Sequence, residues 1–67
     1  MNNETIGTNA GLVWSALNEK NGQTVKELKK TTKIKTDKVL FSAIGWLARE
    51  GKVVLEDTED DVKVTLL

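Results

Sequence analysis

Six lysines crowd into one short segment of the chain, and lysine ammonium groups can bind phosphates. They fall within thirteen consecutive residues and are Lys26, Lys29, Lys30, Lys33, Lys35 and Lys38. Ammonium groups that contact nucleic-acid phosphates release condensed counterions, which makes the binding weaken as salt rises. Short helices also keep lysines as a solvated surface. The cluster therefore has two interpretations, a phosphate-binding surface or a solvated helix face.

A cluster of carboxylates near the C-terminus would oppose phosphate binding. Its members are Glu56, Asp57, Glu59, Asp60 and Asp61. Residues 23–52 carry eight Lys or Arg against three acids, whereas residues 53–67 carry five acids against one lysine. The chain is therefore basic in its middle and acidic at its end, although its formal net charge is zero. The carboxylates could attract a basic partner, including the lysines of a second copy.

Catalysis and metal binding are disfavoured by the residues that the chain lacks. It contains no histidine and no cysteine, so the commonest general base, the best nucleophile and the usual zinc ligands are missing. Asp57, Glu59 and Asp61 alternate, but no glycine-centred loop of the EF-hand type surrounds them. We therefore predict that the protein is not an enzyme and that it has no metal site, no cofactor and no small-molecule ligand.

The 67 residues are predicted to form one domain, residues 1–67. This length is near the lower limit at which a single core keeps a chain folded, so we expect a homodimer. No apolar run approaches the roughly 20 residues that span a bilayer, and the N-terminal segment lacks a signal-peptide pattern. We therefore predict a cytoplasmic protein without a membrane partner.

Two helices are predicted before the end of the lysine cluster. Apolar residues at helical spacing indicate a first helix over residues 4–20, which Asn21-Gly22 would end. Thr24 and Glu27 form a capping-box pattern, because each side chain can bond the backbone amide of the other residue. A second helix is therefore predicted over residues 25–31.

A third helix is predicted to begin with Thr36 or Asp37 as its cap and to continue to Glu50. One stripe of this helix is apolar and would face the core; it consists of Leu40, Ala43, Ile44 and Leu47. The opposite face is formed by Lys38, Ser42, Gly45 and Arg49. The helix thus presents a polar surface beside the lysine-rich turn.

The last sixteen residues predict a β-hairpin. Residues 53–56 and 62–67 alternate in the manner of strands, and the polar segment 57–61 would form a turn of four or more residues. Gln23-Thr24 could add a two-residue bridge to this hairpin. We expect Trp46 to pack over the hairpin strands.

Five residues are candidates for a dimer interface. Gly7 and Gly11 each cost up to about 1 kcal/mol relative to alanine inside a helix. Close approach of another backbone, within the domain or across a dimer, would explain them, and a tolerated, frayed first turn is the alternative. Trp14 and Phe41 either complete the core or anchor a contact between copies. Leu66 adds apolar surface at the C-terminus.

A characteristic sequence motif spans the end of the third helix and the start of the hairpin. Residues 43–53 read AIGWLAREGKV. This phrase resembles "ALGWLAREGKI" in a family of short, stand-alone winged helix-turn-helix proteins of unknown function, and the resemblance covers nearly the whole chain. It implies an α+β fold in which three helices are followed by a two-stranded β-hairpin wing.

The resemblance also implies a function, because winged helices mostly bind DNA with the third helix in the major groove. The matching residues are Lys33, Lys35, Thr36, Lys38, Ser42 and Arg49. Ser42 and Gly45 leave the centre of this face nearly bare, and Arg49 could instead pair with an acidic residue. The implied function is binding of double-stranded DNA, as in a transcriptional regulator. The alternative is a protein-interaction or dimerisation module without nucleic-acid binding.

Overall fold

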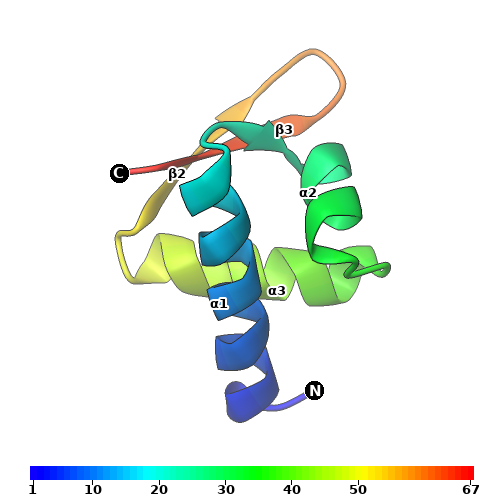
Figure 1. The fold of residues 1–67 in the computed structure, drawn as a ribbon, viewed down its shortest axis with the longest axis vertical. Helices are drawn as coiled ribbons and strands as arrows, with labels where there is room; N and C mark the ends of the chain where they lie inside the picture. Colours follow the sequence, from blue (N-terminus) through cyan, green and yellow to red (C-terminus); the bar gives the residue numbers. More distant parts are fainter.

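The computed structural model describes all 67 residues and places three helices beside a small antiparallel sheet (Figure 1). The elements in chain order are α1 (Asn3–Glu19), β1 (Gln23–Thr24), α2 (Val25–Thr32), α3 (Asp37–Arg49), β2 (Val53–Asp57) and β3 (Val62–Leu66). Figure 1 shows α1 crossing α3, with the sheet at one end of α1. The predicted order of three helices and a hairpin is confirmed. None of the helices combines the length and the hydropathy that a membrane span requires.

Side chains cap the first two helices. Asn2 caps α1, since its Oδ1 accepts a hydrogen bond of 2.9 Å from the Thr5 amide. The predicted capping box opens α2: the Glu27 amide donates to Thr24 Oγ1 at 3.2 Å, and the Thr24 amide donates to Glu27 Oε1 at 2.9 Å. Each box bond satisfies an amide that the helix leaves unpaired.

The end of α1 is closed by a buried side chain that no sequence pattern indicated. Gln23 is only 2% exposed, and its Nε2 donates to the carbonyls of Ala16 at 3.0 Å and Lys20 at 2.9 Å. Its Oε1 accepts a hydrogen bond of 2.9 Å from the hydroxyl of Thr31 in α2. One amide group therefore satisfies two terminal carbonyls of α1 and joins α1 to α2.

The sheet has the strand order β1-β3-β2, with both pairs antiparallel. The predicted two-residue bridge is confirmed, because Gln23 pairs with Val64 of β3. Leu55 of β2 pairs with the same Val64 from the other side. Residues 58–61 form the wing turn between β2 and β3, as the absence of glycine predicted. β2 is left at one edge of the sheet.

The core lies where α1, α2 and α3 meet the base of the hairpin. The predicted apolar stripe of α3 is confirmed, since all four residues are at most 3% exposed. The complete core is Ala10, Val13, Ala16, Leu17, Val25, Leu28, Leu40, Ala43, Ile44, Leu47, Val53 and Val64. Ile34, in the turn between α2 and α3, packs against this core. The turn is therefore anchored to the core by one apolar side chain.

Candidate nucleic-acid interface

The turn between α2 and α3 is held by local hydrogen bonds. Thr32 Oγ1 donates to the Leu28 carbonyl at 2.6 Å and accepts from the Ile34 amide at 3.2 Å. Between them, Lys33 adopts a left-handed backbone conformation with φ 63° and ψ 17°. This conformation is uncommon for a residue other than glycine. It leaves Lys33 exposed on the outside of the turn, next to exposed Lys35.

The N-terminus of α3 has no side-chain cap, in contrast to α1 and α2. Thr36 occupies the N-cap position, but its side chain makes no capping hydrogen bond. The predicted N-cap position at Thr36 is confirmed, but the expected capping bond is absent. The Asp37 carboxylate is instead paired with Lys29. The backbone amides of the first turn of α3 remain available to an anion, and they carry the positive end of the helix dipole.

The lysine cluster separates into paired and unpaired members. Lys29 Nζ lies 2.6 Å from Asp37 Oδ1, which links α2 to the first turn of α3. The other two ion pairs, Lys20 with Glu27 and Lys52 with Glu50, are both 3.7 Å long. Five lysines of the cluster have no ion-pair partner, and they are Lys26, Lys30, Lys33, Lys35 and Lys38. Four of these five surround the uncapped N-terminus of α3 in sequence, from residue 30 to residue 38.

The outer face of α3 is sparse beyond its first turn. Ser42 is half-buried, and its hydroxyl donates to the Lys38 carbonyl at 2.7 Å. Gly45 is exposed, and a Cβ built there would meet no other atom within 4 Å. Arg49 is exposed and forms no ion pair, so the alternative of an acidic partner is wrong. Arg49 lies about 16 Å along the helix from Lys38, at the rise of an ideal helix.

The predicted DNA-contacting residues therefore lie in three places. Lys33, Lys35, Thr36 and Lys38 occur together at the α2–α3 turn and the start of α3. Ser42 is one helical turn further, and Arg49 is the last residue of α3. An extended ligand that follows the helix would be needed to touch all of them.

One carboxylate of the wing turn has a structural role that the sequence did not reveal. Asp61 Oδ1 accepts a hydrogen bond of 2.6 Å from the Val62 amide, and Oδ2 accepts one of 3.2 Å from the Lys26 amide in α2. The Val62 bond is the main reason that the pKa of Asp61 lies below its ordinary value, and the Lys26 bond lowers it further. No three carboxylates come together in a way that could hold a metal ion.

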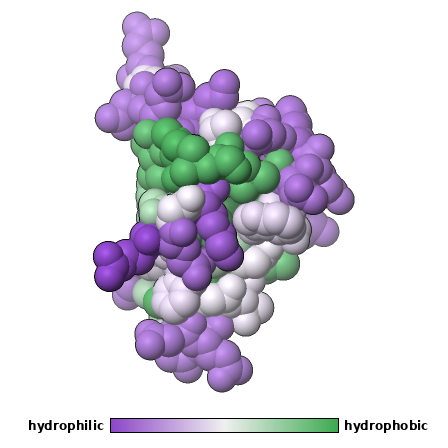
Figure 2. Space-filling view, turned by 90° about the vertical axis from the view of Figure 1, so that its left-hand side faces the viewer, coloured by the Kyte–Doolittle hydropathy of each residue, from purple (hydrophilic) through white to green (hydrophobic).

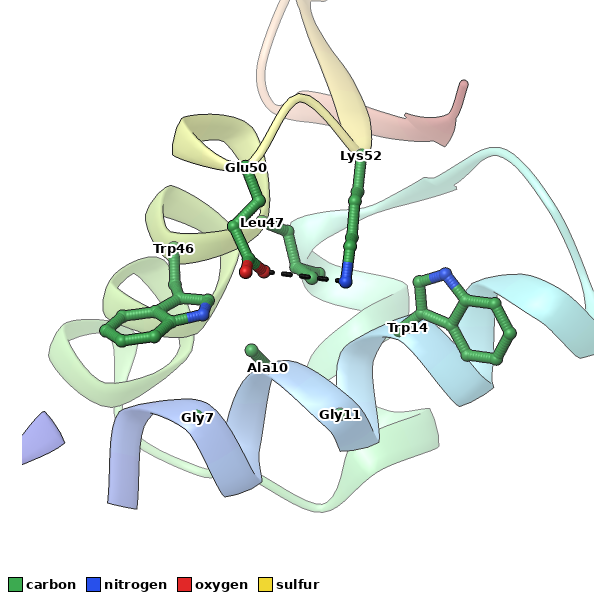
Figure 3. A pocket seen from close by; sticks show the side chains of 8 residues that line it. All are labelled: Gly7, Ala10, Gly11, Trp14, Trp46, Leu47, Glu50 and Lys52. Carbon is green, nitrogen blue, oxygen red and sulfur yellow. Dashed lines mark ion pairs between the residues drawn. The ribbon is translucent and has the colours of Figure 1, made fainter. Parts of the chain in front are cut away.

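A groove between α1 and the end of α3 contains three of the five candidate dimer residues, Gly7, Gly11 and Trp14. Figure 3 shows Trp14 and Trp46 on either side of it, with the Glu50–Lys52 ion pair between them. Trp46 thus faces the groove and α1, not the hairpin strands as predicted.

The two glycines of this groove are not explained by packing within the domain. A Cβ built at Gly7 or Gly11 would meet nothing within 4 Å, so the prediction of a close backbone inside the domain is wrong. The two remaining candidates lie elsewhere. Phe41 is 42% exposed in a separate depression beside α2 and the wing turn, and Leu66 is half-buried against the core. The five candidates therefore do not form one continuous surface.

Comparisons with known proteins agree with this architecture. Residues 1–66 match the family described as "Winged helix-turn-helix domain (DUF2582)". The chain is also similar to the solution NMR structure of protein BT2368 from Bacteroides thetaiotaomicron, with 38% sequence identity and a TM-score of 0.85. That alignment covers 98% of this chain and 79% of the other. No protein with a curated description matches significantly. The chain therefore belongs to the DUF2582 family of winged helix-turn-helix domains.

Proposed function

We propose that this protein binds double-stranded DNA through α3 and the α2–α3 turn, and that it acts as a cytoplasmic transcriptional regulator. One observation carries the proposal. The N-terminus of α3 is the only helix start without a side-chain cap, and it adjoins unpaired lysines. Free amides, a helix dipole and ammonium groups together favour a phosphate group. Winged helices place this same region against DNA.

Each predicted residue has a role in this proposal. Lys33, Lys35 and Lys38 would contact phosphates, and the free Thr36 hydroxyl would donate to a phosphate oxygen. Arg49 would contact the backbone further along the helix. The bare surface at Gly45 would allow a duplex to approach the backbone of α3, but it offers little base readout. We therefore expect the binding to be dominated by phosphate contacts.

The acidic wing turn is compatible with this proposal because of where it is attached. Asp61 bonds the amide of Lys26 at the start of α2, whereas the unpaired lysines Lys33 and Lys35 follow the other end of that helix. The eight residues of α2 separate the two ends by about 12 Å. This separation exceeds the Debye length of roughly 8 Å at physiological salt. Repulsion between the wing carboxylates and phosphates at Lys33 and Lys35 would therefore be largely screened. Asp60 and Asp61 share a depression with Asp37 of α3, so they would still oppose a phosphate on that side of the helix start.

Fluorescence anisotropy with a random duplex at about 50 and 200 mM salt tests the proposal. We expect non-specific dissociation constants of roughly 10⁻⁴ to 10⁻⁶ M that weaken steeply with salt. Lys35→Gln with Lys38→Gln should lower the salt slope by about 2, one unit for each lost phosphate contact. The matched control is Lys20→Gln with Lys63→Gln, which removes the same charge outside the α2–α3 turn. Absence of binding at low salt, or equal losses in both variants, would contradict the proposal.

A second candidate function is a protein-interaction module without nucleic-acid binding. It is favoured by the groove in which Trp14 and Trp46 are 42% and 37% exposed, since large exposed aromatics commonly anchor protein contacts. Replacing Trp14 with alanine should then abolish partner binding without changing any affinity for DNA. In both proposals we expect the protein to act as a homodimer, because a 67-residue core has little stability to spare.

A further inference from the structure

The outer edge of β2 carries backbone groups without partners. The Leu67 amide donates to the Lys52 carbonyl at 3.0 Å, and β2 and β3 are paired in the same register. Bonded and non-bonded pairs alternate in an antiparallel ladder. Val54 and Glu56 therefore bond to β3, whereas Val53, Leu55 and Asp57 direct their amides and carbonyls outward. An exposed strand edge of this kind is a template for pairing with another strand.

Apolar side chains remain exposed along this edge. Val54 is 46% exposed and Leu55 is 41% exposed, although both lie within a strand. Figure 2 views the side of the molecule on which β2 and the C-terminus lie in Figure 1, and an apolar band crosses this face. Pairing along β2 would remove part of this apolar surface from water.

Charge complementarity selects a second copy of the chain as the occupant. In an antiparallel pair of two β2 strands, the residues whose backbone groups face away from β3 must lie opposite the same kind of residue in the other copy. This condition allows only every second register of a two-fold pair. One such register sets Val54 opposite Val54 of the second copy and Val53 opposite Leu55. It also sets Lys52 opposite Glu56, twice by symmetry. Shifting the strands by two residues loses the Lys52–Glu56 pairs. Shifting them by four residues sets Glu56 opposite Glu56, which like-charge repulsion opposes.

We propose that two copies associate by antiparallel pairing of their β2 edges, centred on Val54, to form one continuous sheet. Val53 and Leu55 exchange backbone hydrogen bonds across the junction, and Lys52 pairs with Glu56 on both sides. This interface specifies the surface for the expected homodimer, so it rests on that part of the proposed function and not on DNA binding. It does not include the groove at Trp14, although Lys52 adjoins both.

The size of this interface makes the dimer reversible. A stable complex buries about 800 Å² on each partner, which is roughly 18% of the 4529 Å² surface of this chain. Five residues of strand edge cover less than that. Association should therefore depend on protein concentration within the range of sedimentation experiments.

Charge exchange between Lys52 and Glu56 tests the register. In sedimentation velocity, Lys52→Glu and Glu56→Lys should each weaken dimerisation about tenfold, since each variant sets like charges opposite one another twice. The double variant should restore it, because the pairs are then re-formed with reversed polarity. Glu59→Lys in the wing turn carries the same charge change as Glu56→Lys and should leave the dimer unchanged. Amide exchange at Leu55 should slow as the protein concentration rises.

The outcomes separate the interface from the other proposals. Within one chain, Lys52→Glu opposes Glu50 and Glu56→Lys opposes Lys63, its cross-strand neighbour. Both intrachain repulsions are present in the double variant, so a loss of folding stability cannot explain a restored dimer. Thermal melts measure that loss of stability separately. A monomer at every concentration overturns both the interface and the homodimer. A dimer that the double variant does not restore overturns the interface alone, and the duplex-binding measurement tests DNA binding independently.

Discussion

The carboxylate of Asp61 accepts a hydrogen bond of 3.2 Å from the backbone amide of Lys26, a residue 35 positions earlier in the chain. The bond joins the wing turn to the first turn of α2. The wing turn is itself closed by Thr58, whose amide and hydroxyl both donate to the Asp61 carbonyl at 2.9 Å. Asp61 therefore ties the wing turn to α2, in addition to the pairing of β3 with β1.

Acid should weaken this junction. The pKa of Asp61 is lowered chiefly by the Val62 amide, and the pKa of Glu27 is lowered chiefly by the Thr24 amide. A carboxylate with a depressed folded-state pKa contributes stability that is present above its unfolded pKa and is lost as the pH falls through the folded value. Melting temperatures should therefore fall steeply below about pH 4. Asp61→Asn should have a lower melting temperature at pH 7 and a shallower decrease of that temperature with falling pH. Glu59→Gln should match the parent protein. Equal pH profiles of the melting temperature for all three proteins would refute the role of the Asp61 carboxylate at this junction.

Replacing Gln23 should destabilise the protein more than any surface change. Gln23→Leu fills the buried space but removes the donor of the Lys20 carbonyl and leaves the Ala16 carbonyl with only its backbone bond from the Lys20 amide. The expected loss is about 2 kcal/mol or more, which lowers the melting temperature of a domain this size by roughly 10 °C. Thr31→Val removes only the third bond of this amide group and should cost less. Urea unfolding measures both variants, and a loss for Gln23→Leu no larger than for Thr31→Val would be the contrary result.

The effect of replacing a glycine with alanine on stability should depend on the backbone conformation of that glycine and not on the space around it. A Cβ at Gly11, Gly45 or Gly51 would meet nothing within 4 Å. Gly11→Ala and Gly45→Ala lie within helices and should stabilise the protein by about 0.5–1 kcal/mol. Gly51→Ala should destabilise it by a similar amount, since φ at Gly51 is 71° and a Cβ is strained there. Chemical denaturation of the three variants checks the signs, and stabilisation by Gly51→Ala would contradict the argument.

Lys33 should show a conflict between stability and DNA binding. Its left-handed conformation favours glycine, so Lys33→Gly should stabilise the domain by up to about 1 kcal/mol. The same change removes a proposed phosphate contact and should lower the salt slope of duplex binding by about 1. Lys33→Arg keeps the charge and should preserve the slope. If Lys33→Gly binds duplex with an unchanged slope, Lys33 is not a phosphate contact.

Several features were predictable because their causes are local. The capping box depends on Thr24 and Glu27, three residues apart, and the helix start follows from that spacing. The buried stripe of α3 follows from apolar residues at a period of 3.6. The family phrase at residues 43–53 ties the exit of α3 to the first strand of the wing. Most of the fold was accessible in this way.

The candidate sites were only partly predictable, because the number of charged residues in a segment does not determine which side chains form ion pairs. Arg49 has no ion pair although acidic residues are near it in sequence, while Asp37 pairs with Lys29 of the preceding helix. The missing cap on α3 is also invisible in the sequence, since Thr36 is a favourable N-cap residue. Whether a side chain turns inward to cap depends on its neighbours in space.

The sequence by itself determined three helices, a hairpin wing, the buried stripe of α3 and a basic turn followed by an acidic one. These features arise from interactions between residues a few positions apart. Only the tertiary structure decided that Gln23 closes α1, that Asp61 holds the wing at α2, and that Gly7 and Gly11 border an open groove. Each of these depends on surfaces that meet only after the helices pack, so no local pattern encodes them.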